Sequence, residues 1–131
     1  MDTFDPKRYE AEVKERWGET DAYAESARRT APYTKEDWKA IKAEGGAVTE
    51  ELAARFANGA SPGDREVQAL VDRHREHFDR WFYPCSSEMQ AQLGEMYVAD
   101  PRFAATYERV QPGLAMFLRD AIRVRAGRPA A

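Results

Sequence analysis

Apolar side chains recur at every third or fourth position through the second half of this 131-residue chain. The clearest run follows the segment NGASPG at 58–63, and its members are Val67, Leu70, Val71, His74, Phe78 and Trp81. Such spacing gathers side chains on one face of an α-helix, because the helix completes a turn in about 3.6 residues. No stretch shows the alternation of Val, Ile or Thr that is typical of a half-buried strand. The sequence therefore predicts an all-α protein.

Capping residues, prolines and glycines mark the expected helix boundaries. Thr34 precedes two acidic residues, and Ser86 or Ser87 precedes an apolar run. Asp100 is followed by proline, so all three places are typical of a helix start. The pair Pro112-Gly113 predicts a break before the last helix.

The helix expected after Thr34 contains the pair Gly45-Gly46. Two glycines cost about 2 kcal/mol of helix propensity relative to two alanines. We therefore expect a kink or a mobile joint at this pair.

Composition narrows the class of protein. A chain of 131 residues is expected to form a single domain. The lone cysteine, Cys85, excludes an internal disulfide, and one cysteine with two histidines does not favour a structural zinc site. The net charge of −3 argues against direct nucleic-acid binding. No apolar run approaches the roughly 20 residues that span a bilayer, and the N-terminus is unlike a signal peptide, so we expect a soluble, cytoplasmic protein without metal or cofactor.

The two ends of the chain differ in apolar content. Residues 64–126 carry dense apolar stripes and are expected to form a compact helical core. Residues 1–30 carry one branched aliphatic residue, Val13, and their apolar content is mostly aromatic. Two short helices in that segment would be below the length at which isolated helices are stable in water, so they order only by packing on the core or on a ligand.

Three residues could carry chemistry. His74 and His77 are three residues apart and therefore share a helix face. They could be metal ligands, an acid–base pair, hydrogen-bond donors in a pocket, or residues with a purely structural role. Cys85 lies just before an expected helix start, where the helix dipole lowers a thiol pKa, although most lone cysteines are small buried hydrophobic residues. No oxyanion site or further base assembles around these residues. The sequence therefore predicts no enzyme, and a small Cys/His-dependent enzyme stays an alternative.

A motif in the second half resembles a known family. Residues 83–103 read YPCSSEMQAQLGEMYVADPRF, and matching pieces precede and follow them in order. Those pieces are Arg16-Trp17-Gly18, Thr20-Asp21-Ala22-Tyr23, Tyr33-Thr34-Lys35-Glu36-Asp37-Trp38, His74-Arg75, Pro112-Gly113-Leu114 and Arg119-Asp120-Ala121-Ile122. Together they resemble the TipA-type antibiotic-recognition domain (TipAS), the effector half of a subgroup of MerR-family transcription activators.

The resemblance implies a fold, a ligand and a partner. It implies a globin-like helical domain without haem, whose N-terminal helices, here within 1–30, act as a mobile lid over a cleft. The cleft would bind bulky peptide-derived antibiotics such as thiopeptides, either for MerR-type sensing or for resistance by sequestration. MerR relatives contact DNA through an N-terminal winged-helix domain, which is absent from these 131 residues. We therefore expect either a free-standing domain or one cut from a longer regulator.

Motif position also suggests the ligand-contacting residues. Thiopeptide-capturing relatives have a reactive thiol where this chain has Gln92, so binding here is expected to be reversible, with Cys85 the possible reactive thiol that remains. A helical protein-interaction module is a further alternative. The residues expected to line the cleft are Trp17, Tyr23, Trp38, His74, Trp81, Tyr83, Met89, Gln92 and Met96.

Overall fold

The structure, a computed structural model, describes residues 21–127, and for 21–23 the backbone alone. All regular secondary structure within 21–127 is helical, which confirms the predicted all-α class. The helices are α2 (Asp21–Thr30), α3 (Lys35–Ala57), α4 (Arg65–Trp81), α5 (Ser87–Ala99), α6 (Pro101–Glu108) and α7 (Leu114–Arg125).

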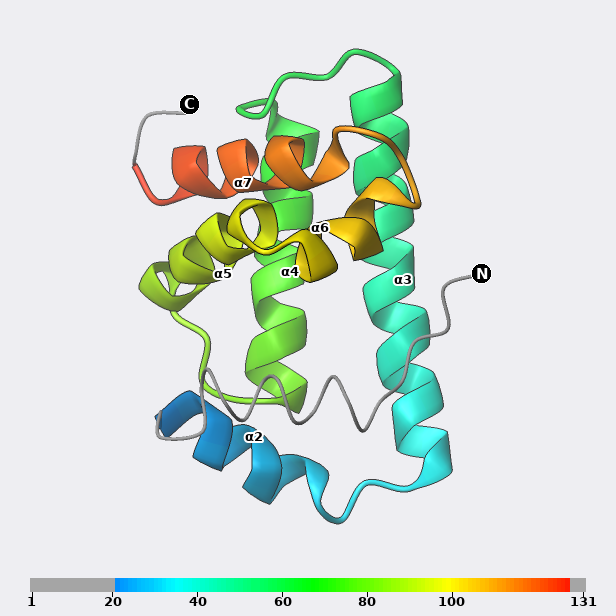
Figure 1. The fold of residues 1–131 in the computed structure, drawn as a ribbon, viewed down its shortest axis with the longest axis vertical. Coiled ribbons are helices and arrows are strands. Elements are labelled where there is room, and N and C mark those ends of the chain that lie inside the picture. Colours follow the sequence, from blue (N-terminus) through cyan, green and yellow to red (C-terminus); the bar gives the residue numbers. More distant parts are fainter. Residues whose placement is uncertain (1–20, 128–131) are drawn as a thin grey trace.

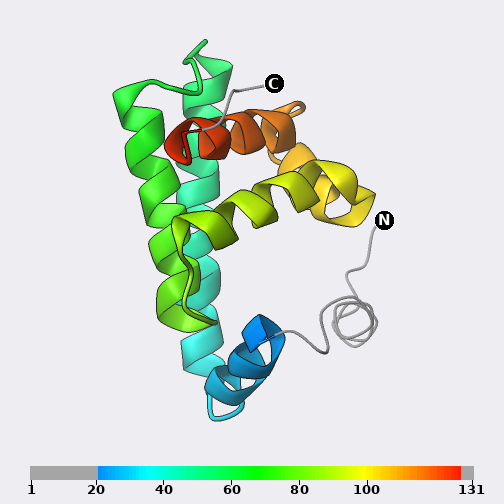
Figure 2. The same ribbon diagram turned by 90° about the vertical axis from the view of Figure 1, so that its left-hand side faces the viewer.

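The helices form two layers. The long helices α3 and α4 run antiparallel, side by side, joined by a loop at one end (Figure 1). A second layer of α5, α6 and α7 crosses them on one face (Figure 2). The helix α2 lies across the opposite end, where α3 begins and α4 ends (Figure 1). Both α5 and α2 therefore lie against the pair formed by α3 and α4.

The predicted helix starts are confirmed, and each has a local cause. Thr34 and Asp37 form a capping box, in which the Asp37 amide donates to the Thr34 hydroxyl and the Thr34 amide donates to the Asp37 carboxylate. The Ser86 hydroxyl accepts from the amide of Met89, and the Asp100 carboxylate accepts from that of Arg102. These contacts join residues two or three apart, so a local sequence signal suffices to place them.

Aliphatic side chains fill the space between the layers. Gly94 of α5 lets that helix approach α7 closely, since a Cβ there would lie 3.2 Å from Ile122 Cδ1. The core extends beyond the predicted 64–126, because Val48 and Leu52 of α3 also join it. The most completely buried members from α4 and α7, between 0% and 1% exposed, are Val67, Val71, Leu114, Leu118, Ala121 and Ile122.

The helix α3 runs through Gly45-Gly46 without interruption, so the pair does not break the helix, and the mobility expected there stays a prediction. Packing explains Gly45, because a Cβ at that position would lie 3.1 Å from Nε2 of His77 on α4. Nothing lies within 4 Å of a Cβ placed on Gly46. The packing of α4 against α3 at Gly45 thus compensates for the low helix propensity of glycine.

In the part of the chain that the structure describes, none of the helices is both long and apolar enough to cross a membrane.

Candidate ligand-binding site

Six aromatic rings gather where α4 ends and α3 begins. Tyr33 packs edge-on against both Trp38 and Trp81, at centroid distances of 5.8 and 5.7 Å. Trp38 also contacts Phe82 at 6.2 Å. Ring contacts then continue from Phe82 through neighbouring rings back along α4. We call this set the aromatic surface: Tyr33, Trp38, Phe78, Trp81, Phe82 and Tyr83.

The rings of the aromatic surface are partly exposed to solvent. Trp38 keeps 44% of its surface exposed, and the other five rings are partly exposed. The cluster of three adjacent rings at 81–83 therefore does not turn wholly into the core, as the sequence led us to expect. Large, flat, partly exposed rings provide stacking area for a partly apolar ligand.

Polar contacts hold Trp81 at the centre of this surface. The Tyr33 hydroxyl donates to the Trp81 carbonyl at 2.6 Å, and the Trp81 indole Nε1–H donates to Glu44 Oε1 at 3.2 Å. The guanidinium of Arg80 lies 4.9 Å from the centroid of the indole ring, within cation–π range. Both the position and the orientation of this ring are thereby specified.

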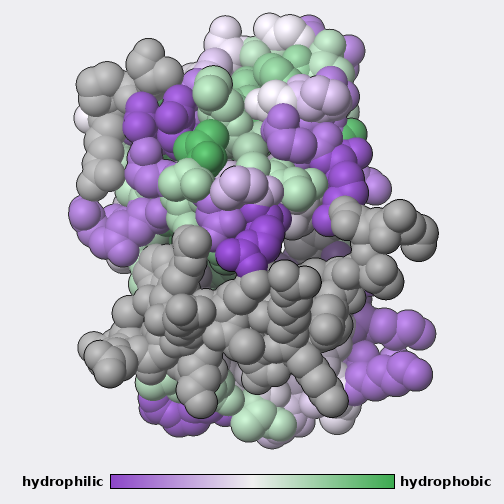
Figure 3. All heavy atoms as spheres, in the orientation of Figure 1, coloured by the Kyte–Doolittle hydropathy of each residue, from purple (hydrophilic) through white to green (hydrophobic). Residues whose placement is uncertain are grey.

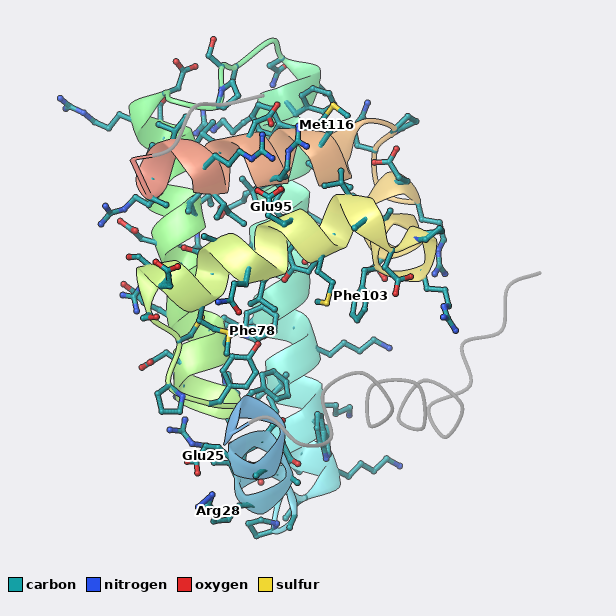
Figure 4. All side chains as sticks on the ribbon, turned by 60° about the vertical axis from the view of Figure 1, so that its left-hand side comes forward. Glu25, Arg28, Phe78, Glu95, Phe103 and Met116 are labelled. Atoms are coloured by element: carbon teal, nitrogen blue, oxygen red, sulfur yellow. The ribbon has the colours of Figure 1, made fainter. Side chains whose placement is uncertain are left out.

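The second layer carries flexible apolar side chains that are only partly buried. Met89 and Met96 of α5 and Phe103 of α6 are half-buried and pack against the core. Figure 4 shows Phe78 and Phe103 on the side of α5 that faces α2. The face seen in Figure 3 mixes hydrophilic with hydrophobic residues over α5, α6 and α7. Thioethers adapt to irregular ligand shapes, so these residues suit the adaptable wall predicted for the methionines.

Behind the aromatic surface lies a chain of buried polar groups. Gln90 Nε2 donates to the Val71 carbonyl at 2.7 Å and to His74 Nδ1 at 3.0 Å. His74 Nε2 then lies 3.1 Å from the Tyr97 hydroxyl, which hydrogen bonds to Tyr107. With Nδ1 accepting, His74 is the neutral Nε2–H tautomer and donates to Tyr97. Burial, together with a smaller effect of the nearby His77, lowers the pKa of His74 to about 3.

These bonds define the place of His74. The imidazole is buried and both of its nitrogens are engaged, so a direct contact with a ligand would require one bond to break. Its role as a polar anchor stays a prediction. Among residues 21–127, no group of three His, Cys, Asp or Glu side chains is placed to hold a metal ion.

Gln90 is a residue that sequence reasoning missed. It is 1% exposed, whereas the predicted Gln92 is exposed on the same helix. The available signal was spacing, because Gln90, Leu93 and Tyr97 recur at the helical period and share a buried face. Gln92 lies off that face, where it is free to meet a ligand, and its contact with one stays a prediction.

The sequence profile of the TipAS antibiotic-recognition domain matches residues 9–124. The chain belongs to this family. It is 44% identical over 125 residues to the HTH-type transcriptional activator TipA of Streptomyces coelicolor, a match that covers 95% of this chain and 49% of the activator. It is 38% identical over 114 residues to the HTH-type transcriptional activator mta of Bacillus subtilis, which covers 87% and 43% respectively. This TipAS domain thus spans about half the length of the curated relatives it matches.

A solved structure supports the same assignment. TipAS of Streptomyces lividans, from a thiopeptide antibiotic multidrug resistance system and in complex with nosiheptide, superposes with a TM-score of 0.89 at 44% identity. The match covers 95% of this chain and 87% of that chain. The helical, globin-like fold expected from the resemblance is therefore confirmed.

Cys85 of this TipAS domain is placed unlike a reactive thiol. It is 1% exposed, and burial raises its pKa to about 11, an effect that the nearby Arg75 guanidinium only partly opposes. The lowered pKa expected from the following helix start is wrong, because desolvation of the thiolate outweighs the helix dipole. Only a small fraction of this thiol is ionised at neutral pH.

Two predicted ligand contacts of this TipAS domain, Trp17 and the side chain of Tyr23, lie outside the described residues. Within the described part, α2 contacts α4, and Arg29 donates to the Asp79 carbonyl at 2.6 Å. The described part of the segment expected to form a lid, α2, thus lies next to the end of α4 that carries Phe78 and Trp81.

Proposed function

We propose that this TipAS domain binds bulky, partly aromatic peptide antibiotics of the thiopeptide class, reversibly and without catalysis. The observation that carries the proposal is the partly exposed aromatic surface, in which Trp38 keeps 44% of its surface exposed and the other five rings are partly buried. Relatives in the family support the ligand class, since TipAS of Streptomyces lividans is solved in complex with nosiheptide. Stacking on rings and adaptable thioether contacts tolerate variation between ligands, which suits recognition of several related antibiotics.

The proposed complex includes a lid formed by residues 1–30. Ordering such a segment on the ligand costs free energy, and it also wraps more ligand surface. Backbone hydrogen exchange in 1–30 and 64–126, without and with nosiheptide, measures this. We expect fast exchange in 1–30 that slows on binding, and equally slow exchange in both segments without ligand would contradict the lid.

Titration with nosiheptide tests ligand binding directly. Intrinsic tryptophan fluorescence should change saturably at one equivalent, because Trp38 and Trp81 belong to the aromatic surface. Trp38→Ala should weaken binding, whereas Met116→Ala, at an exposed position on α7, should not. Absence of binding by calorimetry to nosiheptide and to other thiopeptides would sink the proposal.

Covalent capture is tested separately. Addition of a thiolate to a dehydroalanine needs an ionised sulfur in register with the alkene, and Cys85 is buried and neutral. Intact-mass spectrometry after long incubation with a dehydroalanine-bearing thiopeptide should show unmodified protein. An adduct mapped to Cys85 would overturn reversible binding. An adduct formed only by Gln92→Cys would show that the binding site is shared with capturing relatives.

The biological output follows one of two routes. In a longer regulator, the domain would signal through a MerR-type DNA-binding half in the cytoplasm. As a separate chain, it would confer resistance by sequestration. Expression of these 131 residues alone in a thiopeptide-sensitive bacterium separates the routes. Sequestration predicts an inhibitory concentration that rises in proportion to the amount of protein, and no rise leaves sensing as the function.

A further inference from the structure

A single carboxylate on α3 gathers three donors from the last turns of α4. Glu44 Oε1 accepts from His77 Nδ1 at 2.7 Å and from Trp81 Nε1 at 3.2 Å. Glu44 Oε2 lies 3.6 Å from Arg80 Nη1. The hydrogen bond from His77 is the largest of the effects that lower the pKa of Glu44, so the carboxylate is charged at neutral pH.

The backbone beside Glu44 is shaped for the same contact. Gly45 has no side chain, and a Cβ there would lie 3.1 Å from His77 Nε2. The imidazole therefore packs closely against α3 at the residue that follows its hydrogen-bond partner. His77 also contacts the Phe82 ring edge-on at 6.1 Å, which ties the carboxylate to a second member of the aromatic surface.

Trp81 depends on Glu44 for its orientation. Tyr33 packs against the indole with the two ring planes 89° apart and Arg80 lies over its face, but neither contact engages the indole N–H. The hydrogen bond to Glu44 is the directional contact of the indole N–H, and hydrogen bonds weaken steeply with misalignment. Arg80 is itself held near the ring by the same carboxylate.

We infer that Glu44 is a positioning residue for ligand recognition: through its hydrogen bonds to Trp81 and His77 it pre-organises the aromatic surface for stacking against an antibiotic. The inference rests on the proposed function, because it assigns Glu44 to that same site. A pre-oriented ring binds more tightly, because less rotamer freedom is lost when the ligand arrives.

A matched control separates positioning from general stabilisation. Glu51 on α3 forms an ion pair with Arg73 on α4, so it links the same two helices at a place without an aromatic contact. Glu44→Met removes the acceptors and keeps a good helix former of similar size. We expect this variant to lose about tenfold in nosiheptide affinity, and Glu51→Met to change it by less than about twofold. Equal losses in the two variants would overturn the inference.

A double-mutant cycle tests whether Glu44 acts through Trp81. Trp81→Phe keeps a ring and removes the donated N–H. In that background Glu44→Met should cost less than about threefold in affinity, whereas an undiminished tenfold loss would overturn the inference. Glu44→Gln retains an acceptor oxygen and should restore most of the affinity. Should Glu44→Met fail to fold, the cycle is run with Glu44→Gln, whose smaller loss should vanish in the Trp81→Phe background.

A measurement without ligand keeps this inference distinct from the proposed function. The Trp81 indole ¹⁵N–H signal should move and exchange at least about tenfold faster with water in Glu44→Met, with no such change in Glu51→Met. If thiopeptides fail to bind the parent protein, the proposed function fails, and the indole signal still tests the orientation of Trp81. An unchanged indole signal in Glu44→Met would overturn the positioning role of Glu44.

Discussion

The two ends of α4 carry different kinds of apolar side chain, aliphatic at the start of the helix and aromatic at its end. Its first turns carry Val67 and Val71, each 0% exposed, packed against the equally buried Leu118 of α7. Its last turns carry Phe78 and Trp81, which stay half-exposed among other rings. Aliphatic side chains have no polar group to orient, so they stabilise only by close packing. Rings with an N–H or O–H can be held by directional bonds while one face remains open, and a binding surface needs that combination.

The largest expected effect is on the free energy of unfolding, which should fall more for a substitution at the aliphatic end than for one at the aromatic end. Leu118→Ala should lower the free energy of unfolding by about 2–5 kcal/mol, because it leaves a cavity in the aliphatic end. Trp38→Ala should cost about 1 kcal/mol, since 44% of this residue is already exposed. Urea unfolding of both variants measures the difference. A cost for Trp38→Ala equal to that of Leu118→Ala would remove the distinction.

The buried polar chain between the ends should also be sensitive. Gln90→Ala should cost about 2–3 kcal/mol, because it leaves a cavity, takes the donor from the buried His74 Nδ1 and removes the side-chain bond to the Val71 carbonyl. Gln92→Ala, two residues along the same helix and exposed, should stay within about 0.5 kcal/mol of the parent. Similar unfolding midpoints for the two variants would show that the polar chain contributes little.

Acid should weaken the fold through His74. Its pKa is lowered to about 3 in the folded protein, whereas an unfolded histidine takes a proton near pH 6.5. The contribution is therefore complete above pH 6.5 and declines as the pH falls toward 3, by up to about 1.4 kcal/mol per pH unit. Between pH 7 and 5 we expect a loss of about 2 kcal/mol in urea unfolding. His74→Gln should flatten this slope, and an unchanged slope would assign it to other groups.

The smallest effect should show how tightly α3 packs against the ring-rich end of α4. Gly46→Ala should stabilise the protein by about 0.5–1 kcal/mol, because a methyl group there meets nothing within 4 Å. Gly45→Ala should give no such gain, since its methyl group would press on His77. Thermal unfolding of the two variants measures this difference, and equal gains would mean that His77 yields without cost.

The predictable part of the fold depends on interactions between residues that are close together in the sequence. The starts of α3, α5 and α6 depend on Thr34, Ser86 and Asp100, whose caps reach only two or three residues along the chain. The apolar stripe of α4 follows from the helical period. The motif at 83–103, together with the matching pieces before and after it, indicated the family, which the match over 9–124 then confirmed. The crowding of three adjacent rings at 81–83 suggested that at least one of them would not face the core, without any indication of what holds Trp81 in place.

What the sequence by itself determined is thus the helices, their boundaries and the family. Tertiary structure decided how individual polar residues are used. Gln90 is polar in sequence and buried because its acceptors lie on another helix, 16 and 19 residues away. Cys85 lies by a helix start, yet burial by the rest of the fold sets its pKa. In the sequence Glu44 looks like an ordinary helix position and Gly45 like a weak one, and only the packing of His77, 33 residues from Glu44, gives each of them a role. Caps and periodicity arise from neighbours along the chain, whereas burial and hydrogen-bond partners depend on which distant segments the packed layers bring together.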